Sequence, residues 1–197
     1  MKKVRIISRN IACIALFSVG TLAVTSCNNN KAEDPKDVAE EINDDKIDDR
    51  KSEKDADFLV EAASINMGEI KLGELAQQKG ILKDVKDMGA MMVKEHNAAL
   101  NDLKSLAANK SVTLPAAITE ENQEDYDKLN KKSGADFDKE YADMMVKGHK
   151  DAIDKFEKAA SDAEDGDIRN WAASMLPALR AHLEHAEKIQ DKAKAAK

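Results

Sequence analysis

From about residue 55 onward, hydrophobic positions recur at alternating steps of three and four, the period of an α-helix that buries one face. Four long stretches show this pattern, and Gly, Pro and polar residues separate them. Aromatic residues make up only 4% of the chain, which disfavours a sheet. The pattern therefore predicts an all-α domain with long helices over about 55–79, 82–108, 136–162 and 167–192.

The connections between these helices predict how they are arranged. Gly80 is expected to stop the first helix, Gly166 to stop the third, and Asp167 to cap the fourth. Such short connections force neighbouring helices to run antiparallel. The one long connection follows Leu114-Pro115 and is expected to hold a short helix over about 120–131. The sequence thus predicts an antiparallel four-helix bundle.

One helical unit appears twice, since the string MMVKEH at 91–96 returns as MMVKGH at 144–149. Each copy ends in a histidine, His96 or His149, that lies on the apolar stripe of its helix. His182 lies on the stripe of the fourth helix, and Glu69 on that of the first. Each of the four helices is therefore expected to turn one polar side chain into the core.

Heights along the bundle decide whether these side chains meet. His149 and His182 stand almost equally far from Gly166, whereas Glu69 and His96 are level only if their turn lies near Leu82. A buried carboxylate or imidazole is costly without a partner. We predict either a transition-metal site for zinc, copper or iron, or a hydrogen-bonded Glu–His network in a structural or interaction protein. The predicted metal ligands are Glu69, His96, His149 and His182.

Three further residues near the histidines have two interpretations each. Met92 and Met145 stand one turn before their histidines, where a thioether would favour Cu(I) but also fills an irregular core. Pro177 lies inside the fourth helix, shortly before His182. The resulting kink would widen a pocket beside the histidine or let the helix bend around the core.

Composition removes several classes of function. The formal charge of −7 and the pI near 5.2 argue against nucleic acid as a partner. No serine sits in a nucleophile elbow, and no phosphate-binding or dinucleotide signature is present. The sequence fixes no reaction, and a metal enzyme is a third hypothesis that no substrate-pocket signal supports.

The first 26 residues have the layout of an export signal, with Lys and Arg followed by an apolar run. That run is about fourteen residues long, shorter than the roughly twenty that a spanning helix needs. It ends in Val24-Thr25-Ser26-Cys27, which resembles a bacterial lipobox and implies cleavage before Cys27 and acylation of that cysteine. We therefore predict a lipid-anchored cell-envelope protein, in the outer membrane and facing the periplasm or the cell surface. The membrane contact would be the lipid.

Residues 27–54 are almost all Asn, Asp, Glu, Lys and Ala, and they offer little apolar surface to offset the entropy of ordering. We predict an acidic flexible tether, with a short amphipathic helix over 38–47 as the alternative. The bundle domain is expected to span 55–192, the size of one ordinary domain.

Several motifs recur in order across the four expected helices, namely Asp57-Phe58, Gly68-Glu69-Ile70-Lys71-Leu72-Gly73, Met92-Val93-Lys94-Glu95-His96, Leu114-Pro115, Phe137-Asp138, Tyr141, Met145-Val146 with His149, and Leu176-Pro177 with His182. With these motifs the chain resembles the bacterial family of exported proteins called domain of unknown function 4142. The resemblance covers about residues 55–190 and implies a ferritin-like four-helix bundle without an established activity. It also implies that Glu69, His96, His149 and His182 are motif positions of the family. The paired Glu-x-x-His of ferritins is missing, because Val93 and Val146 stand three residues before His96 and His149.

Overall fold

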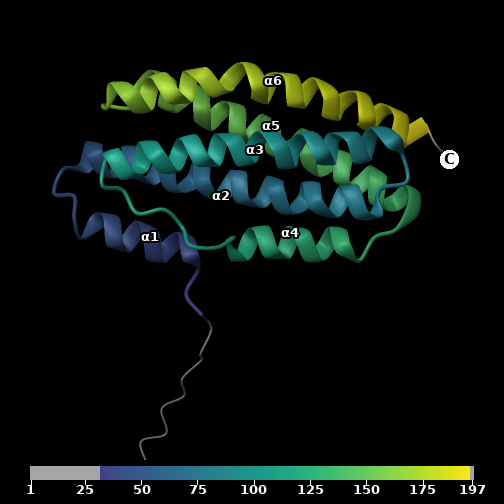
Figure 1. The fold of residues 1–197 in the computed structure, drawn as a ribbon, viewed down its shortest axis with the longest axis horizontal. Coiled ribbons are helices and arrows are strands. Elements are labelled where there is room, and N and C mark those ends of the chain that lie inside the picture. The colour runs from purple at the N-terminus through teal and green to yellow at the C-terminus, as the bar shows by residue number, and fades with distance from the viewer. Residues whose placement is uncertain (1–31, 196–197) are drawn as a thin grey trace, which may run out of the picture. The chain divides into compact units, whose positions relative to one another are not determined.

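A computed structural model describes residues 32–195 of the 197-residue chain. Within this range the chain forms six α-helices and no strand (Figure 1). Their bounds are α1 Pro35–Asp44, α2 Arg50–Lys79, α3 Lys83–Asn109, α4 Glu120–Asn130, α5 Gly134–Asp162 and α6 Gly166–Ala195. The expected export signal and Cys27 lie outside the described residues.

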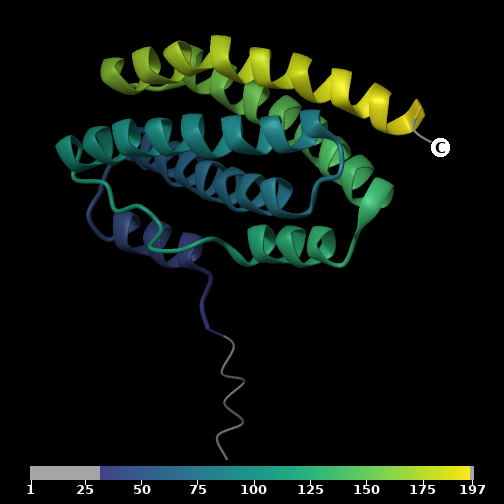
Figure 2. The same cartoon turned by 45° about the vertical axis from the view of Figure 1, so that its right-hand side comes forward.

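The four long helices form the predicted bundle. α2 and α3 pair as one antiparallel hairpin and α5 and α6 as another, while α2 also packs on α5 and α3 on α6. Figures 1 and 2 show the two hairpins stacked, with α1 and α4 along the outside of α2. The segment that contains α4 carries the chain back along the bundle, so every lateral pair of long helices is antiparallel.

Each hairpin turn is held by an aspartate of the other hairpin. Asp138, near the start of α5, accepts backbone hydrogen bonds from Ile81 (3.0 Å) and Leu82 (2.8 Å) in the α2–α3 turn. Asp55, near the start of α2, accepts hydrogen bonds from the backbone of Glu164 and Asp165 in the α5–α6 turn. Both aspartates are buried. These contacts fix how far the two hairpins slide along each other.

The core of the bundle consists of two apolar clusters, one toward each end. The cluster near the α5–α6 turn includes Leu59, Leu103 and Phe156, and the cluster near the α2–α3 turn includes Met88 and Phe137. The histidines belong to neither cluster and lie between them along the helices. The apolar core is therefore interrupted at mid-height by a polar layer.

The prediction of a flexible tether is wrong for residues 35–54. α1 begins at Pro35 behind Asp34, whose side chain accepts a hydrogen bond from the backbone of Lys36. It packs on α2, and its buried Asn43 exchanges two hydrogen bonds with the backbone of Thr113. α2 itself begins at Arg50, earlier than expected. The alternative of a short helix in this segment is the one that the structure supports.

Two helix ends also differ from the expected chemistry. Gly80 follows the last residue of α2, as predicted, but with φ −54° and ψ 140° it does not adopt the left-handed conformation common at helix ends. A Cβ at Gly80 would lie 2.7 Å from Val85, so close packing is what requires glycine there. α6 is capped by Asp165 rather than Asp167, because Asp165 accepts from the backbone of Asp167 and Ile168.

None of the helices over residues 32–195 combines the length and the apolar character that crossing a membrane would require.

The role of the buried aspartates can be tested with Asp138→Ala. The substitution leaves the backbone N–H groups of Ile81 and Leu82 without their charged acceptor, so we expect a loss of about 1–3 kcal/mol in the free energy of unfolding. Urea unfolding measures it, with Asp154→Ala on the exposed face of α5 as the control. Equal losses in the two variants would contradict the role given to Asp138.

Candidate metal centre

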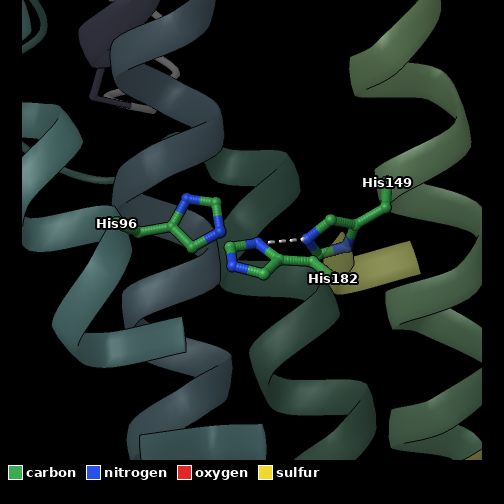
Figure 3. Close-up of side chains that lie close together, drawn as sticks. All are labelled: His96, His149 and His182. Atoms are coloured by element: carbon green, nitrogen blue, oxygen red, sulfur yellow. Dashed lines mark hydrogen bonds between the residues drawn. The ribbon is translucent and has the colours of Figure 1, made fainter. Parts of the chain in front are cut away.

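Three of the four predicted site residues meet in the polar layer. His96 of α3, His149 of α5 and His182 of α6 are buried, with side chains that turn toward one another (Figure 3). Each ring offers one nitrogen, and these three nitrogens all lie within 4.8 Å of one another. The predicted convergence of three imidazoles from three helices is therefore seen in the structure.

The outward-facing nitrogen of each ring has a partner that identifies where its hydrogen lies. The Asn66 amide donates to the carbonyl of Ala62 (2.7 Å), so its oxygen is left to accept from Nδ1 of His96 (3.0 Å). Nδ1 of His149 donates to the carbonyl of Met145 (2.9 Å). With Nδ1 protonated in both rings, Nε2 of each carries the lone pair.

In His182 the nitrogen that donates is Nε2, and the lone pair is on Nδ1. Its Nε2 donates to Oε2 of Glu95, 2.8 Å away, which leaves the lone pair on Nδ1. That Nδ1 lies 3.3 Å from Nε2 of His149, and Nε2 of His96 has no hydrogen-bond partner among the described residues. Three lone pairs thus converge in the core without a hydrogen to share between them.

Burial disfavours the protonated forms of His96 and His182. Burial, reinforced by His149 and His182, lowers the pKa of His96 to about 3. Burial also lowers the pKa of His182, and the hydrogen bond to Glu95 opposes this effect only in part. At neutral pH both rings are neutral, so the lone pairs remain available to another cation.

Glu69 does not join the three histidines. Its Oε1 lies 3.9 Å from Nδ1 of His149, the nitrogen that faces away from the other rings, and its buried Oε2 has no partner among the described residues. The α2–α3 turn centres near Ile81, so Asn66 is level with His96 and Glu69 is about one turn, roughly 4.5 Å, too close to the turn. The predicted set of four is therefore a set of three histidines with a separate carboxyl group.

The carboxyl group of Glu69 is buried in the core apart from the three converging nitrogens. Burial raises the pKa of Glu69, with Asp125 adding to the effect and His149 opposing it. The hydroxyl of Tyr141 is also buried without a partner among the described residues, and burial together with Glu69 raises its pKa well above 10.0. Both groups therefore favour their protonated forms.

Two residues that hydrogen-bond the histidines, Asn66 and Glu95, were not predicted from the sequence. Apolar periodicity favours Ile65 over its polar neighbour Asn66 as the buried residue, yet Asn66 is 3% exposed and Ile65 is only partly buried. Glu95 lies on a half-exposed face of α3 and reaches His182 across the bundle, a contact that no local pattern indicates. Met92 and Met145, the candidate thioethers, pack in the apolar cluster near the α2–α3 turn.

Comparison with known proteins agrees with this architecture. The family described as "Domain of unknown function (DUF4142)" matches residues 43–189. The chain belongs to the DUF4142 family. No curated protein matches this DUF4142 chain. A crystal structure of a conserved hypothetical protein from Mycobacterium tuberculosis is similar at a TM-score of 0.58 and 17% identity, over 72% of this chain and 93% of that one, which is a likeness of fold alone.

Because burial raises the pKa of Glu69, its ionisation destabilises the folded chain. The carboxyl ionises near pH 4.5 in the unfolded DUF4142 chain but at higher pH when folded, so the folded state keeps a proton that the unfolded state has released. Stability conferred by the protonated carboxyl is therefore lost as the pH rises above 4.5. We expect Glu69→Gln to raise the free energy of unfolding of metal-free protein at pH 8 but not at pH 4.

Urea unfolding at both pH values measures this difference. Glu74→Gln, a half-exposed carboxyl group on the same helix, is the control and should leave the pH dependence of wild type in place. A Glu69→Gln variant that keeps that dependence unchanged would refute the assignment of a buried, protonated carboxyl group.

Proposed function

We propose that this bundle binds one first-row transition-metal ion through Nε2 of His96, Nε2 of His149 and Nδ1 of His182. The observation that carries the proposal is the convergence of three buried lone pairs whose other ring nitrogens are already engaged. A bound ion would give all three lone pairs a partner at once. It would also remove the repulsion between His149 and His182, whose facing nitrogens are 3.3 Å apart.

The groups behind the histidines support a metal in particular. Ligating histidines regularly donate their second N–H to a carboxylate, a backbone carbonyl or an amide, which orients the ring and fixes its tautomer. Here Glu95, the Met145 carbonyl and Asn66 fill these three places. A bundle core without a ligand to position would gain more stability from apolar side chains at these sites.

The donor set favours zinc or copper over iron. Three neutral imidazoles suit zinc and copper, whereas non-haem iron sites commonly add a carboxylate to two histidines. The nearest core carboxylate, Glu69, lies behind His149 instead of facing the three nitrogens. Three protein ligands also leave a tetrahedral ion with one open position, as in catalytic rather than structural zinc sites.

Metal content of the protein, purified without an affinity tag, tests the proposal. We expect about one equivalent of zinc or copper, and loss of that metal in His96→Ala, His149→Ala and His182→Ala because each removes one of three ligands. His185→Ala, which changes an exposed histidine on α6, should retain the metal, as should Glu69→Gln. Elemental analysis and the shift in melting temperature on adding metal provide the two readouts.

Protein that stays metal-free in excess zinc and copper, with an unchanged melting temperature, would overturn the proposal. The histidines would then form a polar network of a structural or interaction protein, and the His149→Ala variant would show only a loss of stability.

The carboxylate behind His182 gives a graded test of the same site. Glu95→Gln keeps the shape of the side chain but removes the charge that orients and polarises the imidazole, so we expect metal affinity to fall about 10- to 100-fold. Competition with a chromogenic chelator measures this affinity. Glu157→Gln, an exposed carboxylate elsewhere on the bundle, is the control and should leave affinity unchanged.

We further propose that the protein is a cell-envelope lipoprotein anchored through Cys27 and directed to the outer membrane. The support is the sequence of the first 27 residues, an export signal that ends in a lipobox-like Val24-Thr25-Ser26-Cys27. We expect the full chain in bacteria to incorporate labelled fatty acid and to fractionate with membranes. Cys27→Ala should abolish both, and a Cys27→Ala protein that still carries the label would contradict the anchor.

A further inference from the structure

A cavity of about 260 Å³ opens beside the three histidines, between α3 and α6. α2 and α5 contribute to its inner wall. Two of the proposed metal ligands, His96 and His182, line the cavity, whereas His149 does not. The residues around it are Ile65, Asn66, Glu95, His96, Ala98, Ala99, Asp102, Phe156, Met175, Ala178, Leu179 and His182.

Small side chains border the cavity on both α3 and α6. Ala98 and Ala99 of α3 face Ala178 of α6 across the opening. Pro177 lies next to Ala178 inside α6 and cannot donate the helical hydrogen bond to Ala173, which loosens the helix beside the opening. The cavity lies beside His182 and includes Ala178, the residue after Pro177, whereas Pro177 itself does not line it.

The lining of the cavity combines two imidazoles with apolar and acidic side chains. His96 and His182 belong to the lining, and the buried Nε2 of His96 has no hydrogen-bond partner among the described residues. The wall is apolar and includes Phe156, Met175 and Leu179. Glu95 and Asp102 are the charged residues of the lining, and neither Lys nor Arg belongs to it. The acidic lining disfavours an anionic occupant.

We propose that this cavity is a binding site for a small neutral molecule with a nitrogen donor on a compact apolar body, the donor taking the open position of the metal. The inference rests on the metal site proposed above. Two of the three proposed ligands, His96 and His182, line the cavity, so a fourth ligand of the ion would reach it from the cavity. An apolar cavity of about 150 Å³ holds benzene, so this one has room for an aromatic ring together with the donor group.

Binding at the open position can be measured with Co²⁺ in the site, because a fourth ligand changes the visible absorption spectrum of the bound ion. The probes are imidazole, 4-phenylimidazole and azide, titrated into the Co²⁺-loaded protein. We expect 4-phenylimidazole to bind at least tenfold more tightly than imidazole, because its ring enters the apolar cavity, and azide to bind more weakly than either.

A cavity-filling variant separates the pocket from the metal. Ala99→Leu should keep Co²⁺ and its affinity for imidazole within a factor of about three but remove the preference for the phenyl compound. Ala90→Leu, on the exposed face of the same helix, should behave as wild type. The variants share the same chemical change and differ in whether it points into the cavity.

The outcomes distinguish the two proposals. Protein that binds Co²⁺ but shows no preference between the imidazoles, or prefers azide, overturns the pocket and leaves the metal site intact. Undiminished binding of 4-phenylimidazole to metal-free protein also overturns the inference, because the donor would not be on the metal. Protein that takes up no Co²⁺ overturns both.

Discussion

The structure depends on three buried imidazoles that each offer a lone pair to the same point. His96, His149 and His182 are all at most 4% exposed, and their other nitrogens donate to oxygen atoms of Asn66, Met145 and Glu95. A half-satisfied polar group in a low-dielectric interior costs more than an apolar side chain in the same place. Packing alone would favour leucine at these positions, so the layer is costly to the fold unless a cation completes it.

The two buried aspartates make such a layer geometrically feasible. Asp138 holds the α2–α3 turn and Asp55 holds the α5–α6 turn, so each hairpin is fixed along its length by the other. Convergence within a few ångströms requires helix heights correct to less than one turn, because each residue of slip moves a side chain by about 1.5 Å. The fold controls height at both ends of the bundle and places the histidines between them.

Much of this architecture could be predicted from the sequence, because it follows from local patterns. Helix bounds and the four-helix bundle came from apolar periodicity, and the level match of His149 and His182 came from counting residues on either side of Gly166. Height across the other turn could not be predicted as well, because Gly80 ends α2 in an extended conformation and the turn is centred nearer Ile81 than Leu82. A shift of this size is enough to replace Glu69 by Asn66 opposite His96.

Contacts between distant segments account for the other errors. α1 buries Ala39 and Asn43 but little else, and it is held by hydrogen bonds from Asn43 to Thr113 and from Lys36 to Glu61. Composition therefore gave no sign of order in that segment. Glu95 was missed for a related reason, because its neighbours in sequence place it at the surface while its partner, His182, comes from another helix.

The four-helix bundle does not by itself indicate which metal the site would hold. Ferritin-like bundles hold their metals mainly through carboxylates, which neutralise the charge of the ion. Here the three converging donors are neutral, so a divalent ion would keep most of its charge and depend on Glu95 and Asp102 nearby for compensation. A neutral ligand set and an opening on one side are the properties of a site that exchanges its fourth ligand rather than one that buries metal for stability. The proposed site would therefore present a metal to a ligand, and the likeness of fold adds no argument for iron storage.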